Sequence, residues 1–294
     1  MKLAMILDDG LPVAALVQAD RFWPLADIIP GLARADMVAA ITALTATPMP
    51  VPQGAGRPFE RAQLLAPLPI PPHNVMCVGK NYHAHAREFA GSGYDSSSTS
   101  PADAIPQAPI IFTKPTSSIT GPDADIPLVP GLDQGVDYEA ELAVIIGQGG
   151  RRIPRDRAMA HVFGYTVVND VTARDLQGRH KQWFLGKGID GFCPMGPWIV
   201  TADELDPRTM RITCRVNGEL RQDASVTDLI FDIPTLIEAI SLSMTLQPGD
   251  IIATGTPEGV GIGFKPPRFL ADGDVVECAV AGIGHIRNTV RRVA

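Results

Sequence analysis

Short apolar runs separated by glycine, proline and polar residues recur along most of the chain. Runs of about 4–8 apolar residues bounded by such turn formers are typical of strands. Strands are expected at residues 75–79, 109–114, 140–147, 164–170, 196–201, 250–255 and 274–284. Two hairpins are also expected, one over residues 1–18 around Asp8-Asp9-Gly10 and one over residues 211–222 around Asn217-Gly218.

Helical spacing is rarer than strand spacing. Helices are expected at residues 33–46, 157–163, 171–180 and 234–244. Many strands with few helices favour a mainly β fold, a roll or sandwich, over a doubly wound parallel sheet.

Proline-rich segments indicate where the chain is divided into domains. Prolines and glycines punctuate residues 47–58 and residues 65–74, where no periodicity is present. We therefore expect a small N-terminal β-rich domain with its linker over residues 1–68, and a larger domain over residues 69–294.

One of the apolar runs begins with acids at alternate positions. In "VDYEAELAVIIG", Asp137, Glu139 and Glu141 alternate with apolar residues. On one strand, the three side chains would share a face, about 7 Å apart. The carboxylates in such a row repel one another unless a positive charge lies among them. The alternative is a half-exposed strand with its acids in water, and the spacing alone leaves both interpretations open.

Asp170 adds a fourth acid, at the end of the apolar run "YTVVND". Together with Glu139 and Glu141 it would form a set of oxygen ligands. Such a set suits a hard cation, Mg²⁺, Mn²⁺ or Ca²⁺, better than zinc.

Two other stretches carry candidate catalytic groups. His85 and Glu88 are three residues apart and would share one face of a helix, where the carboxylate could orient the imidazole as a general base. Lys187 lies among glycines and apolar residues, and could bind a carboxylate or stabilise an oxyanion. For each, an ordinary surface residue is the alternative. The glycine-rich stretch 248–261 lacks the residue order of a phosphate-binding loop, so a nucleotide site is rejected.

The composition limits which binding partners and which cellular compartment are expected. The chain has 294 residues, a net charge of −7 and only short basic clusters, so neither nucleic acid nor an anionic membrane is expected as a partner. The apolar stretches are interrupted by acids or proline, which excludes a leader or a membrane span and predicts a soluble cytoplasmic protein. The four cysteines are widely spaced among apolar residues, which predicts buried free thiols.

Six motifs, taken in order, resemble the fumarylacetoacetate hydrolase family. They are "CVGKNYHAHAREF", "IIFTKP", "DYEAELAVIIG", "GYTVVNDVTARDLQ", "GKGIDGFCPMGPWIVT" and "GDIIATGTPEGVG", and they extend over residues 70 to 290. The resemblance implies a mixed β-sandwich roll, a homodimer, and a divalent cation at the centre, with Mg²⁺ expected first and Mn²⁺ or Ca²⁺ as alternatives.

The resemblance also implies roles for residues that match the family's motifs. The metal ligands would be Glu139, Glu141 and Asp170, whereas Asp137 receives no metal role. The other implied site residues are the active-site lysine Lys187, the water-activating pair His85 and Glu88, and the substrate-binding residues Arg174, Gln177 and Thr256.

The resulting hypothesis is a metal-dependent hydrolase that cleaves the C–C bond of an acylpyruvate, such as fumarylpyruvate or maleylpyruvate, to pyruvate and a carboxylic acid. Decarboxylation of oxaloacetate, and isomerisation or hydration of an unsaturated 2-oxo dicarboxylic acid, remain alternatives. Residues 90–108 form a longer connection than is common in the family. They are interpreted as a lid over the substrate, with a plain surface insertion as the alternative.

Overall fold

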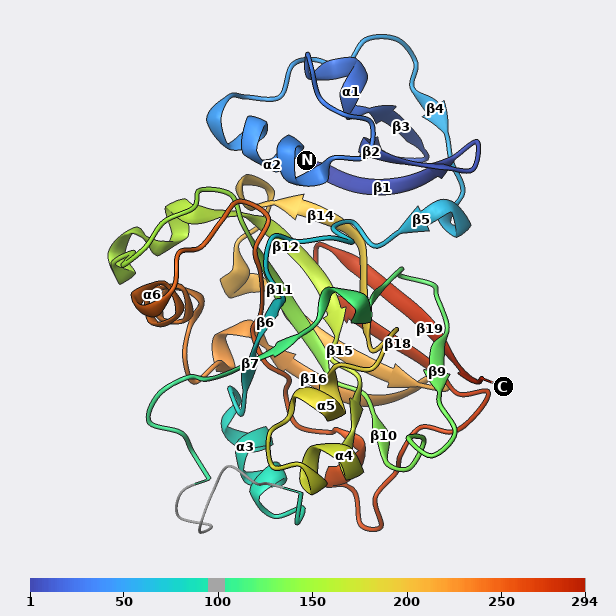
Figure 1. The fold of residues 1–294 in the computed structure, drawn as a ribbon, viewed down its shortest axis with the longest axis vertical. Helices are drawn as coiled ribbons and strands as arrows, with labels where there is room; N and C mark the ends of the chain where they lie inside the picture. Colours follow the sequence, from blue (N-terminus) through green and yellow to red (C-terminus); the bar gives the residue numbers. More distant parts are fainter. Residues whose placement is uncertain (95–103, 294) are drawn as a thin grey trace.

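The protein is mainly β, with two large sheets and a few short helices (Figure 1). The computed structural model describes residues 1–94 and 104–293. The central part of the segment interpreted as a lid, residues 95–103, therefore lies outside the described residues. No helix in the described part of the chain is long and apolar enough to cross a membrane.

The larger sheet contains twelve strands within the described residues. Its main path runs through β4 (Arg57–Pro58), β3 (Arg21–Pro24), β2 (Leu11–Gln18), β1 (Lys2–Asp8), β14 (Cys193–Thr201), β12 (Val162–Asn169), β11 (Ala140–Ile146), β17 (Ile251–Ala253), β6 (Val75–Gly79) and β7 (Ile110–Lys114). β5 (Leu64–Leu65) pairs with β1, and β8 (Ile119–Thr120) pairs with β14.

A second sheet and a short ribbon complete the β structure. The second sheet runs through β16 (Glu219–Ser225), β15 (Arg211–Val216), β18 (Val275–Val280), β19 (Gly284–Arg292) and β9 (Ile126–Leu128). The ribbon pairs β10 (Val136–Asp137) with β13 (Thr172–Ala173). The helices are α1 (Leu25–Ile28), α2 (Met37–Ala46), α3 (His83–Ala90), α4 (Arg174–Arg179), α5 (Phe184–Lys187) and α6 (Ile233–Ser243).

β11 is the centre of the core. It is buried along its whole length, and β12 and β17 pair with its two edges. Its alternate side chains enter two different apolar clusters. Leu142 and Val144 pack in the cluster that includes the second sheet, whereas Ala143 and Ile145 pack in the cluster that includes the N-terminal strands.

The N-terminal strands extend the large sheet. β1 pairs antiparallel with β14. In Figure 1, β1, β2 and β3 lie with α1 and α2 at one end of the molecule. The predicted hairpin is present, and Asp9 and Gly10 at its turn have the positive φ values, 51° and 76°, that a type I′ turn requires. The domain boundary near residue 68 stays a prediction.

Most predicted elements are present, with three corrections. The helix expected at residues 171–180 begins only at Arg174, because Thr172–Ala173 pair with β10 as strand β13. The run 274–284, expected as one strand, is interrupted by a turn, after which β19 continues the sheet. The predicted helix 157–163 is a 3₁₀ helix, η4 (Arg155–His161), and residues 162 and 163 belong to β12. All four cysteines are free and buried, as predicted.

The packing of β12 against β14 gives a test of the fold. At Gly164 a methyl group would overlap the carbonyl oxygen of Val200 on the paired strand. We expect Gly164→Ala to lower the free energy of unfolding by about 1–3 kcal/mol, measured by urea denaturation. The control is Gly178→Ala in α4, where the nearest atom to the new methyl is 3.8 Å away. This change should leave stability equal or raise it by up to about 1 kcal/mol. Equal stabilities for the two variants would contradict this account.

A candidate metal and substrate site

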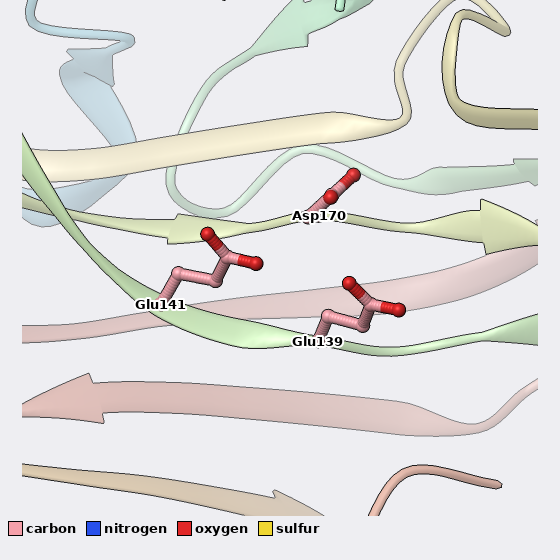
Figure 2. Close-up of side chains that lie close together, drawn as sticks. All are labelled: Glu139, Glu141 and Asp170. Atoms are coloured by element: carbon pink, nitrogen blue, oxygen red, sulfur yellow. The ribbon is translucent and has the colours of Figure 1, made fainter. Parts of the chain in front are cut away.

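Three carboxylates meet at the ends of β11 and β12. Glu141 is in β11, Glu139 directly precedes that strand, and Asp170 directly follows β12. The backbone N–H of Asp170 donates to the carbonyl of Glu139 at 2.8 Å, which aligns the two strand ends. One oxygen of each carboxylate lies within 4.8 Å of the others, and the three side chains lie close together in Figure 2. All three are buried, which excludes the alternative of a half-exposed strand with its acids in water.

Buried cations surround two of these acids. The Nζ of Lys187 lies 2.8 Å from Glu139 and 2.7 Å from Asp170. Lys114, at the end of β7, donates to Asp170 at 2.7 Å, and Arg174 lies 2.7 Å from Glu139. Lys187 is only 2% exposed, so it is not the surface lysine that the sequence left open.

The three acids differ in how well their charges are compensated. Burial opposes ionisation of Glu139, but Lys187 and Arg174 outweigh it and lower the pKa of Glu139 to about 2. Burial, together with the charges of Asp170 and Glu139, raises the pKa of Glu141 well above its ordinary value. Glu141 accepts a hydrogen bond from the N–H of Gly255 at 2.9 Å, and no basic side chain in the described residues forms an ion pair with it.

This arrangement fits a further cation. Two like charges about 4 Å apart repel by about 4 kcal/mol at an effective dielectric constant of 20. Glu141 keeps such a repulsion with both Glu139 and Asp170, and a cation beside it would remove the repulsion. An all-oxygen ligand set suits Mg²⁺, Mn²⁺ or Ca²⁺. The residues present are therefore suited to hold the expected divalent cation.

Asp137 does not stand in line with the other acids, which corrects the expectation of three carboxylates on one face of one strand. The chain leaves β10 at Asp137 and enters β11 only at Ala140, so the strand periodicity is interrupted at Tyr138 and Glu139. Asp137 instead accepts a hydrogen bond from Nε of Arg174 at 2.9 Å.

Arg174 and Gln177 come from the first turns of α4. Arg174 is its first residue and 1% exposed. Its Nη1 donates to Oε1 of Gln177 at 3.1 Å, so the two side chains are held together on one face of the helix. This places the predicted substrate-binding residues beside Glu139.

His85 and Glu88 lie on α3, as their spacing predicts. Nδ1 of His85 is 3.3 Å from Oε2 of Glu88, and Oε1 of Glu88 accepts from the N–H of Gly259 at 3.1 Å. His85 is buried and lines the same pocket as Lys187. The pair is therefore part of the site, not an ordinary turn of a surface helix.

Most of the predicted site residues line one pocket. It is lined by His85, Glu139, Arg174, Gln177, Lys187 and Thr256, with apolar walls from Val78, Phe89, Phe112 and Trp183. The hydroxyl of Thr256 donates to the carbonyl of Ala140 at 3.1 Å and accepts from Gln222 at 2.7 Å. A pocket with both charged and apolar walls is suited to a small organic anion.

Two structural partners of the site, Lys114 and Gln222, were not assigned roles from the sequence. Lys114 ends the motif "IIFTKP", and a lysine closing an apolar strand was an available signal. Gln222 carried no signal, because it is one polar residue in the alternating pattern of β16.

Comparisons with known proteins agree with this geometry. Residues 74–291 match the family model described as "Fumarylacetoacetate (FAA) hydrolase C-terminal". The chain is 49% identical over 233 residues to a protein named oxaloacetate tautomerase YisK from Bacillus subtilis, which covers 79% of this chain and 74% of that protein.

Solved structures with the same fold extend over the whole chain. A fumarylacetoacetate hydrolase from Exiguobacterium antarcticum has a TM-score of 0.83 and 41% identity, with 100% of both chains covered. A maleylpyruvate hydrolase from Sphingobium sp. SYK-6, solved with manganese(II) and pyruvate, has a TM-score of 0.73 and 33% identity at the same coverage. By its sequence match and by its structure, the chain belongs to the fumarylacetoacetate hydrolase family.

Proposed function

We propose that the protein is a divalent-metal-dependent enzyme that interconverts the enol and keto forms of a 2-oxo dicarboxylic acid, with oxaloacetate as its first candidate substrate. The observation that carries the proposal is the buried cluster of Glu139, Glu141 and Asp170, with Arg174 and Lys187 beside it. The name of the Bacillus subtilis relative, an oxaloacetate tautomerase at 49% identity, supports oxaloacetate over other 2-oxo acids.

Anion binding follows from the charges that face the pocket. Arg174 offers planar donors that match a carboxylate, and Lys187 offers a compact positive charge. A divalent cation held by the three carboxylates would supply Lewis-acid charge beside the 2-oxo acid oxygens. Gln177 and Thr256 provide neutral polar groups that orient the ligand.

Tautomerisation moves one proton between C3 and the oxygen on C2. Since the Glu88 carboxylate accepts a hydrogen bond from His85 Nδ1, neutral His85 carries its proton on Nδ1 and keeps a lone pair on Nε2. In this proposal Nε2 takes the proton from C3, and the protonated imidazole then gives that proton to the oxygen on C2, so no co-reactant is needed. The aromatic walls formed by Phe89, Phe112 and Trp183 limit access of water to the reacting carbon.

Hydrolysis of an acylpyruvate is the second candidate, and the His85–Glu88 pair is the observation that favours it. In that reaction His85 would take a proton from water, and the resulting hydroxide would attack the C4 carbonyl. Cleavage of the C3–C4 bond then leaves its electrons on C3, which is protonated to give pyruvate and a carboxylic acid. The likeness to a maleylpyruvate hydrolase supports this alternative.

Parallel assays should separate the two reactions. With Mg²⁺ or Mn²⁺, we expect the protein to accelerate the loss of the enol absorbance of oxaloacetate without releasing pyruvate. The same preparation is then given fumarylpyruvate and maleylpyruvate, and pyruvate is measured with a coupled dehydrogenase. Rapid pyruvate release from these acylpyruvates, with no effect on oxaloacetate enol, would reverse the order of the two candidates.

Glu141→Gln tests the cation site. The amide can still accept from Gly255, but the charge beside Glu139 and Asp170 is gone. We expect Mn²⁺ affinity, measured by calorimetry, to fall at least about tenfold, and activity to fall with it. Metal-free protein should be as stable as the wild type or more stable, because a buried like charge is removed. The control is Glu238→Gln, an exposed glutamate on α6. Unchanged Mn²⁺ affinity in Glu141→Gln would refute the assignment.

His85→Asn tests proton transfer. Loss of the base should lower kcat by about 10²–10⁴-fold, while Mn²⁺ affinity stays at the wild-type value, because His85 is not one of the three clustered acids. His83→Asn is the matched control, since its exposed side chain is on the same helix but does not line the pocket. A wild-type kcat in His85→Asn would remove this residue from the mechanism of both candidate reactions.

A further inference from the structure

Asp137 is a buried carboxylate whose two oxygens are fully used. Oδ1 accepts from the backbone N–H groups of Gly261 at 2.6 Å and Tyr138 at 2.9 Å. Oδ2 accepts from the N–H of Ile262 at 3.1 Å and from Nε of Arg174 at 2.9 Å. One side chain therefore ties the first residue of α4 to η8 (Gly261–Gly263), which lies far from it in sequence.

The segment around η8 also holds the helix that carries His85. Gly259 donates its N–H to Glu88, and a methyl group at Gly263 would overlap the Glu88 carboxylate, so the two lie in direct contact. Phe89 of α3 packs in one apolar cluster with Val260 and Ile262. The position of α3 over the pocket thus depends on where residues 259–263 are held.

The other partner of Asp137 enters the acid cluster. Arg174 lies 2.7 Å from Glu139 and donates to Gln177. Because Arg174 and Ile262 share the same oxygen of Asp137, a shift of one changes the geometry available to the other.

We propose that Asp137 is a positioning residue that connects the two halves of the site. It holds Arg174 against Glu139, and it holds residues 259–263 against Glu88, which orients His85. It does not line the pocket and does not belong to the group of clustered acids. The inference rests on the proposed function in one respect, since it takes His85 as the group that transfers the proton.

Asp137→Asn tests the connection with little change in volume. The amide oxygen can still accept from Gly261 and Tyr138, but the amide nitrogen then faces the N–H groups of Ile262 and Arg174, which lose their acceptor. We expect kcat to fall by about 10²-fold with a much smaller change in KM. By hydrogen exchange, residues 83–90 and 257–264 should exchange faster than in the wild type.

Asp250→Asn is the matched control. Asp250 is also fully buried and also accepts from a backbone N–H, that of Gln247 at 2.7 Å, and from His73 at 2.8 Å. The Asp250→Asn change should lower the free energy of unfolding without slowing the reaction and without faster hydrogen exchange in α3. If Asp137→Asn and Asp250→Asn have the same kcat and the same exchange over residues 83–90, the inference is overturned.

A double-mutant cycle with Glu88→Gln separates positioning from general destabilisation. If Asp137 acts largely through Glu88, Asp137→Asn should lower kcat by less than about tenfold in the Glu88→Gln background. An equal loss in both backgrounds would contradict the connection. Should Asp137→Asn fail to fold, Gly263→Ala displaces Glu88 directly and is expected to slow the reaction and loosen α3. A folded Gly263→Ala protein with wild-type kcat and exchange would also overturn the inference.

A failure of the proposed function can be distinguished from a failure of the inference about Asp137. If the wild-type protein turned over neither oxaloacetate enol nor an acylpyruvate, the proposed function would fail. The exchange comparison between Asp137→Asn and Asp250→Asn would still decide whether Asp137 holds α3.

Discussion

Repulsion among three buried carboxylates is the constraint on which the rest of the site depends. Glu139, Glu141 and Asp170 are buried and have oxygens within 4.8 Å of one another, and like charges are costly in a buried site. Lys114, Lys187 and Arg174 compensate two of them. Glu141 keeps the remaining repulsion, and this is the physical reason for the site to attract a divalent cation.

The β strands around the site hold these repelling charges close together. β11 is buried on both faces and paired on both edges, so the acids at its start cannot move apart to relieve their repulsion. The cations arrive from elements on different sides, with Lys114 at the end of β7, Arg174 at the start of α4 and Lys187 at the end of α5. Cationic groups fixed in this way favour an anionic ligand.

The same frame is compatible with more than one reaction of a 2-oxo acid. In the proposed function, the anionic end of the substrate would be bound by groups fixed by β11, β12 and α4, and the proton would be transferred by His85 on α3. Tautomerisation and C–C hydrolysis then differ in whether His85 acts on the C3 proton or on a water molecule.

The sequence by itself determined the mainly β class, most strand positions and, through ordered motifs, the residues that gather in the pocket. These features are encoded locally, in short periodic runs and in the residues within each motif. Tertiary structure alone decided the partners of Asp137, the roles of Lys114 and Gln222, and the separation of β10 from β11. The reason is physical: Lys114 meets Asp170 across 56 positions of sequence, and Asp137 meets Gly261 across 124. Such contacts depend on how the strands and loops pack, and no local pattern specifies them.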